Sequence, residues 1–93
     1  MSKQQRVPIK LSEKIAPGVY SNQMVVNHTR EEFLIDFVNL FPPEGVVTAR
    51  VIVSPGHLKR MIRALQENLA RYEQTHGAVI EAQPPDPHPF ESN

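Results

Sequence analysis

The clearest hydrophobic pattern in the chain lies between residues 55 and 76. Apolar residues recur there at intervals of three and four positions, which is the spacing of one face of an α-helix. They are Leu58, Met61, Ile62, Leu65, Leu69 and Tyr72. Ser54 is a suitable N-cap, Pro55 fits the first helical position, and Gly77 fits the position after the last turn. The pattern predicts a helix over residues 55–76, about 33 Å long.

Two shorter segments have the pattern of β-strands. Over residues 19–28, Tyr20, Met24 and Val26 alternate with polar side chains, as in a strand with one buried face. Residues 46–54 are rich in β-branched side chains, which pack well on a pleated sheet. This second segment stops at the helix cap, and we expect a strand in each.

Residues 33–41 are compatible with two structures. The four residues before this segment match a helical capping box, and its three phenylalanines recur at helical spacing. The same residues also alternate at period two, which is typical of a strand. We favour the strand, because its apolar positions then align with both neighbouring strands, and we keep the helix as the alternative.

The alignment gives an expected strand register. A turn at residues 28–31 puts Val26 opposite Phe33, and a loop centred on Pro43 puts Phe33 opposite Val53. One face of the sheet then collects the apolar side chains that the helix can cover. They are Tyr20, Met24, Val26, Phe33, Ile35, Phe37, Val47, Val51 and Val53.

The opposite face of the sheet is too apolar to face water. It holds Val25, Leu34, Val38, Leu40 and Ile52 beside Asp36, Thr48 and Arg50. One helix covers one side of a three-stranded sheet only, so we expect this face to pack on a second copy of the chain. The expected interface residues are Leu34, Asp36, Val38, Arg50 and Ile52. The charges of Asp36 and Arg50 fall opposite each other, and we favour a cross-strand ion pair over a ligand contact.

Charge and proline content divide the chain into three parts. Residues 1–16 carry a net charge of +3 and residues 17–77 are neutral. Residues 78–93 carry a net charge of −3 and four of the nine prolines of the chain. We expect a flexible basic arm, a single α+β domain and a disordered acidic Pro-rich tail. The expected fold is an antiparallel three-stranded meander followed by one long helix. A domain of about 60 residues has a thin core, which again favours a homodimer or higher oligomer.

Composition excludes several classes of protein. The chain has no cysteine, so disulfides, thiol catalysis and Cys-based metal centres are absent. Its 10 basic residues balance its 10 acidic ones, so no overall charge favours nucleic acid or a membrane surface. No apolar run approaches the ~18 residues of a membrane span, and the first residues do not resemble a secretory signal. We expect a cytoplasmic protein that does not bind membranes.

Catalytic and cofactor chemistry also lack support in the sequence. Ser21 and Ser54 stand beside no evident His–carboxylate pair, and the four glycines are isolated rather than gathered in a phosphate-binding loop. The four histidines lie in different segments without ligand spacing. We expect no enzyme activity, no cofactor and no metal.

One cluster of basic residues stands out at the start of the expected helix. His57, Lys59, Arg60 and Arg63 lie off the apolar stripe, three of them with a positive charge that opposes the helix dipole. An ordinary solvated face explains them without any ligand. The functional interpretation is a surface for an anionic partner, such as an acidic peptide or a nucleic acid.

Several short motifs together resemble a known family. They are Tyr20-Ser21-Asn22, His28-Thr29-x-x-Glu32-Phe33, Asp36-Phe37, Pro42, Ala49-Arg50-Val51-Ile52, Ser54-Pro55-x-His57-x-Lys59-Arg60 and Leu65-x-x-Asn68-Leu69-x-x-Tyr72-Glu73. In combination they are similar to a small prokaryotic family catalogued as a domain of unknown function. The resemblance covers about residues 18–73, implies a small stand-alone prokaryotic protein and carries no established activity.

These observations favour an interaction protein over an enzyme. We expect a homo-oligomeric, chaperone- or adaptor-like module that binds an unidentified protein or peptide. The alternative is a small nucleic-acid-binding protein that uses the basic cluster and the N-terminal arm.

Overall fold

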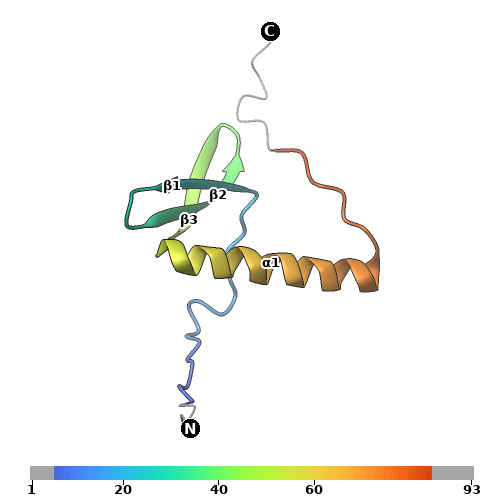
Figure 1. Ribbon diagram of the computed structural model, residues 1–93. Helices are drawn as coiled ribbons and strands as arrows, with labels where there is room; N and C mark the ends of the chain where they lie inside the picture. The colour runs from blue at the N-terminus through green and yellow to red at the C-terminus, as the bar shows by residue number, and fades with distance from the viewer. Residues whose placement is uncertain (1–5, 85–93) are drawn as a thin grey trace.

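The structure, a computed structural model, describes residues 6–84 (Figure 1). It contains three strands and one helix: β1 (Gln23–His28), β2 (Phe33–Phe41), β3 (Glu44–Val53) and α1 (Pro55–His76). The strands form one antiparallel sheet in the order β1-β2-β3, and α1 follows β3 directly. The fold is therefore α+β, a three-stranded meander followed by a C-terminal helix, as the sequence predicts. Most of the predicted acidic tail and the first five residues of the predicted arm lie outside the described residues.

The ends of α1 confirm the predicted capping residues. The Ser54 hydroxyl accepts a hydrogen bond from the backbone N–H of His57 at 3.1 Å, which satisfies one free donor of the first turn. At the other end, the backbone N–H of Gly77 donates to the carbonyl of Glu73. Gly77 has φ of 93°, a conformation that favours glycine and that ends the helix.

Residues 33–41 form β2, so the strand interpretation is confirmed and the helix is wrong. Phe33 pairs with Val53 and Asp36 pairs with Arg50, as expected. After Phe37 the register shifts by one residue, and Thr48 is the extra residue of a bulge. Its hydroxyl donates to the carbonyl of Phe37 at 3.1 Å.

The bulge corrects the expected position of Val47. Val38 pairs with Val47, so both side chains lie on the sheet face away from α1. The sequence prediction placed Val47 on the helix side because it assumed an uninterrupted alternation along β3. A single inserted residue moves every side chain beyond it to the other face.

The expected register between β1 and β2 is wrong by two residues. Val26 pairs with Ile35 rather than with Phe33, because the turn spans Thr29–Glu32 instead of starting at His28. The backbone N–H of Thr29 donates to the carbonyl of Glu32, and the Thr29 hydroxyl accepts from the backbone N–H of Glu32. A shift of two residues leaves each side chain on its expected face.

The strand limits also differ from the prediction. β1 begins at Gln23 rather than at residue 19, and Tyr20 lies outside the sheet with 69% of its surface exposed. The amide of Asn22 takes over the pairing there: it accepts from the backbone N–H of Leu40 at 2.8 Å and donates to its carbonyl at 2.9 Å. β3 runs from Glu44 to Val53, two residues longer at its start and one shorter at its end.

Very little of this chain is buried. Among the described residues, Ile35 is the buried apolar side chain and Asp36 the buried charged one. The chain exposes 9113 Å² of surface, whereas a compact folded chain of its mass exposes about 5,400 Å². Part of the excess belongs to residues 6–12 and 77–84, which lie outside the helix and the strands and are exposed. The rest lies on the two sheet faces and on α1, whose first half runs along the sheet while its second half extends past it (Figure 1).

Candidate functional site

An apolar groove of about 390 Å³ separates the sheet from the first half of α1. Its floor is formed by Met24 and Val26 of β1 and by Ile35 and Phe37 of β2. Its other wall is the apolar stripe of α1, with Leu58, Met61, Ile62, Ala64 and Leu65. All of these lining side chains are apolar. The groove therefore presents apolar side chains from three elements to whatever fills it.

The groove reaches a free edge of the sheet. β1 is the first strand in the order β1-β2-β3, so the backbone groups on its outer side have no neighbouring strand among residues 6–84. Beyond the groove the stripe of α1 continues, and Leu69 and Tyr72 stay about half exposed. A free strand edge next to an open apolar surface is a ready site for an added strand.

The predicted interface residues gather on the other side of the sheet, which we call the ion-pair face. Arg50 donates to both carboxylate oxygens of Asp36, from Nε at 2.7 Å and from Nη2 at 2.9 Å. Around this pair lie the apolar side chains Val25, Leu34, Val38, Val47 and Ile52. Of these, Ile52 is 53% exposed.

The ion pair changes the ionisation of both partners. The hydrogen bonds from Arg50 lower the pKa of the Asp36 carboxyl below its ordinary value, against the opposite effect of desolvation. The same hydrogen bonds raise the pKa of Arg50. The favoured interpretation of these two residues as a cross-strand ion pair is confirmed by this geometry.

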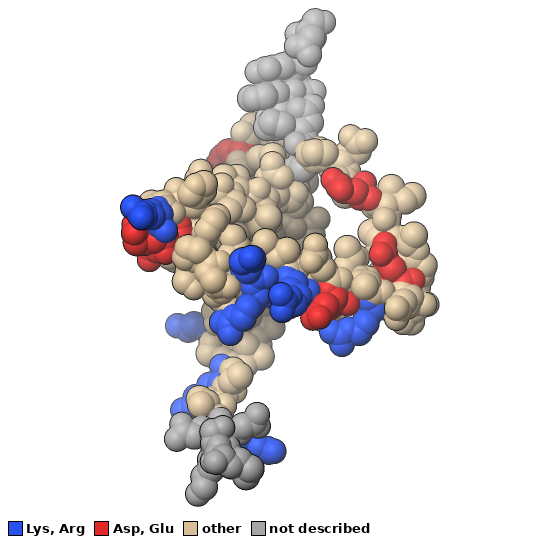
Figure 2. All heavy atoms as spheres, in the orientation of Figure 1, with Lys and Arg blue, Asp and Glu red and all other residues tan. Residues whose placement is uncertain are grey.

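The basic cluster lies along the first turns of α1 and is exposed. Figure 2 shows Lys and Arg atoms gathered over this part of the helix. Within the cluster, Nη2 of Arg60 lies 2.9 Å from Nδ1 of His57. Among residues 6–84 the one ion pair joins Arg50 to Asp36, so none of the described acids forms a salt bridge with the cluster.

The N-terminal arm contributes a feature that the sequence reasoning missed. Residues 12–18 form tight turns, with Ile15 and Ala16 donating to the carbonyl of Ser12. This anchor lies against Thr48 and Ala49 of β3. Ahead of it, Val7, Ile9 and Leu11 are 73%, 94% and 68% exposed. Their period-two alternation is present in the sequence, but the net charge of the segment favoured the interpretation as a flexible arm.

The described residues contain neither a metal-binding group of side chains nor a membrane-spanning helix. No group of three His, Asp or Glu side chains comes together in residues 6–84 in a way that would hold a metal ion. In the same part of the chain, no helix has the length and apolar character needed to cross a membrane. Among the described residues, the apolar groove and the ion-pair face are the surface features that remain as candidates for a site.

Comparison with known proteins assigns the chain to a family. No curated protein and no solved structure matches it significantly. A family model described as "Protein of unknown function (DUF3467)" matches residues 1–81. The match extends beyond the expected residues 18–73, takes in the whole N-terminal arm and stops before the Pro-rich end. Because it covers most of the chain, the protein belongs to this family of unknown function.

Proposed function

We infer that the protein is a non-catalytic, homo-oligomeric interaction module of the prokaryotic cytoplasm that binds a protein or peptide partner, like a chaperone or adaptor. The observation that carries this proposal is the apolar groove beside the free edge of β1. Apolar grooves of this size take side chains of a ligand, and a free strand edge binds an extended backbone. The two features adjoin, so one extended segment can use both.

The groove favours an extended segment with apolar side chains at alternate positions. In such a segment, every second side chain points to the same face, and that face would enter the groove. Met24 lies in the floor of the groove and Met61 in its helical wall. Methionine side chains are flexible and polarizable, so this groove adapts to side chains of different shape.

The homo-oligomeric part of the proposal is supported by the ion-pair face. Its apolar side chains surround a paired charge, and α1 lies on the other side of the sheet. A two-fold contact would place the Asp36–Arg50 pair of one copy against the same pair of the next. This contact leaves the groove open to a partner.

Binding of a designed peptide tests the function. A fluorescent peptide that alternates Val, Ile and Leu with serine should raise its anisotropy as the protein is added. A peptide of the same composition, scrambled so that its apolar residues no longer alternate, should bind at least tenfold more weakly. Equal binding of both peptides would contradict recognition of an extended strand.

Two variants of α1 locate the binding. Met61→Glu puts a charge into the groove and should abolish binding of the alternating peptide. Gln66→Glu adds the same charge to an exposed position of the same helix outside the groove and should leave binding unchanged. If the two variants bind alike, the groove is not the site.

The alternative partner is a nucleic acid bound at the basic cluster. It is favoured by the exposure of Lys59, Arg60 and Arg63 and by the lack of an acidic partner for them among the described residues. Such binding would weaken steeply with added salt, whereas binding in an apolar groove would not. Titration with a labelled oligonucleotide at two salt concentrations separates the two functions.

A further inference from the structure

The N-terminal arm has the pattern of a β-strand without a sheet of its own. Val7, Ile9 and Leu11 share one face of the extended segment, and Arg6, Pro8 and Lys10 share the other. Each of these three apolar residues has at least 68% of its surface exposed. An apolar strand face of this kind is stable in water only when it is covered.

Pro8 determines how this strand can pair. Proline lacks a backbone N–H, and in a strand the backbone groups of alternate residues point to the same edge. Pro8 therefore leaves a gap on the edge that it shares with Arg6 and Lys10. The other edge carries the complete backbone groups of Val7, Ile9 and Leu11, so the arm fits the outermost position of a sheet.

The outer edge of β1 matches this strand in length and in character. The five residues from Val7 to Leu11 span about 17 Å, and the six residues of β1 span about 20 Å. Met24 and Val26 of β1 form part of the groove floor. An added strand beside β1 would place its apolar face next to these residues and beneath the exposed Ile62 and Leu65 of α1.

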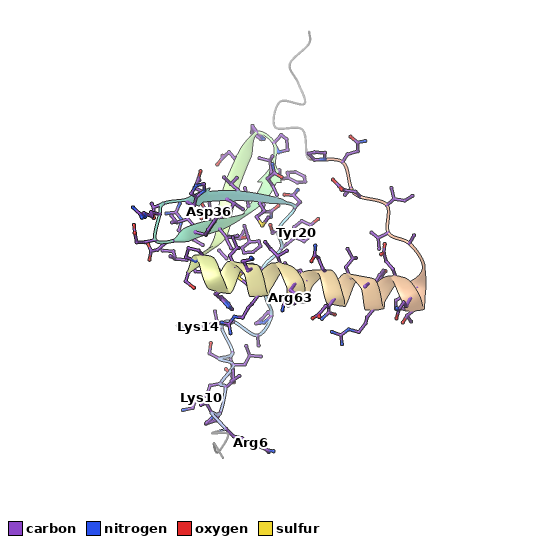
Figure 3. All side chains as sticks on the ribbon, in the orientation of Figure 1. Arg6, Lys10, Lys14, Tyr20, Asp36 and Arg63 are labelled. Atoms are coloured by element: carbon purple, nitrogen blue, oxygen red, sulfur yellow. The ribbon has the colours of Figure 1, made fainter. Side chains whose placement is uncertain are left out.

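The arm does not reach this edge in its own chain. Its anchor at residues 12–18 lies near β3, which is the edge strand opposite β1 in the same sheet. From there it runs away from the sheet, and Figure 3 shows Arg6, Lys10 and Lys14 in succession on the side of α1 that faces away from the strands.

We propose that the arm of a second copy adds to the outer edge of β1 as a fourth strand and lays Val7, Ile9 and Leu11 into the groove. The proposal rests on the proposed function, since it names the first occupant of the same groove. The arm lies within the residues that define the family match. An outside polypeptide then binds by displacing the arm of a neighbouring copy, which keeps the groove covered until a partner arrives.

Disulfide trapping in the full chain tests the arrangement, because the protein has no cysteine of its own. Single-cysteine variants with tags of different size are mixed in pairs and oxidised. Ile9→Cys should form a disulfide with Met24→Cys or Val26→Cys, whose side chains lie on the groove side of β1. Lys10→Cys, on the other face of the arm, should form one with Val25→Cys.

The swapped pairs are the matched controls. Ile9→Cys with Val25→Cys, and Lys10→Cys with Val26→Cys, place the two sulfurs on opposite faces of the sheet and should give at most a tenth of the product. Equal yields for all four pairs would overturn the proposal, because they would show random collisions of the arm. The Ile9→Cys/Val26→Cys double variant must link two chains, and a disulfide within one chain would also overturn it.

The alternating peptide separates this proposal from the proposed function. In the oxidised dimer of the Ile9→Cys/Val26→Cys double variant, each groove holds an arm linked by a disulfide. This dimer should not bind the peptide, and reduction should restore binding. Peptide binding that is the same before and after reduction would show that the arm is not in the groove, while the proposed function would stand. Failure of the peptide to bind any form, with the predicted disulfides formed, would overturn the proposed function and leave the arm exchange in place.

Discussion

Asp36 shows how a charged residue is accommodated in the middle of a sheet. Its residue surface is 9% exposed, and the Arg50 guanidinium binds both carboxylate oxygens at hydrogen-bond distance. The pair joins β2 to β3 across directly opposed positions. Removing one partner alone would leave the other without its hydrogen bonds. The free energy of unfolding lost in this way exceeds the net contribution of the intact pair.

The ion pair predicts a loss of stability at acid pH. The pKa of Asp36 is lower in the folded chain than in the unfolded chain, so the unfolded chain binds more protons in acid. The contribution of Asp36 is complete above its unfolded pKa and is lost as the pH falls through the lower folded pKa. Urea unfolding measured at pH 6 and at successively lower pH should show this decline.

Asp36→Asn is the control for that measurement. The variant should be less stable than the parent at pH 6 and should lose less stability on acidification, because its amide does not titrate. A decline of the same size in both proteins would assign the pH dependence to other carboxylates.

At the scale of the elements, α1 depends on its cap more than most helices of its length. The residues of its first half line the groove beside the sheet, and its described side chains include no buried one. Most helical stability in proteins comes from packing of an apolar face, which is incomplete here within one chain. Local capping therefore carries a larger share.

Ser54→Ala should lower the free energy of unfolding by about 1 kcal/mol, because the N–H of His57 loses its acceptor. Ser54→Asp keeps an acceptor and adds a favourable charge at the helix start, so it should match or exceed the parent. Circular dichroism during urea unfolding measures both. If alanine and aspartate have the same effect, the Ser54 hydroxyl does not cap the helix.

The basic cluster gives a second prediction for α1. Changing Lys59, Arg60 and Arg63 together to glutamine should leave the helix as stable or slightly more stable, because it removes positive charge near the positive end of the helix dipole. If the cluster holds an anionic partner, this variant should lose that partner. Unfolding of the variant would instead show that these three residues have a structural role.

A single copy leaves apolar side chains exposed on both faces of its sheet. One side of the sheet carries the groove, the other carries the ion-pair face, and one buried apolar side chain, Ile35, is the described core. A domain of this size buries only about 60% of its unfolded surface even when compact. Association is the way in which this chain can cover both faces.

Light scattering at micromolar concentration should give a mass of at least twice 10.5 kDa. Ile52→Lys, in the exposed part of the ion-pair face, should reduce the mass or the concentration range over which the oligomer persists. Gln66→Lys, which adds the same charge to an exposed position of α1, should leave the mass unchanged. A monomeric parent protein would contradict both the expected interface and the arm exchange.

The elements and their order can be predicted from the sequence alone. The helix limits follow from Ser54 and Gly77, whose side chain and backbone freedom act within one turn. The assignment of β2 followed from pairing, because the alternating apolar residues match on both neighbours. These are short-range properties or strict alternations, and both are readable in a single chain.

Three features are visible only in the folded chain: the register of β1 against β2, the sheet face on which Val47 lies, and the position of the groove. The register depends on which residue closes the turn at Thr29, and the side of Val47 depends on the extra residue Thr48. Neither changes the local pattern enough to be read from it. The groove exists because the helix leaves β3 and lies over β1 and β2 without filling the space between them. That distance is set by packing between elements far apart in sequence, which no local periodicity encodes.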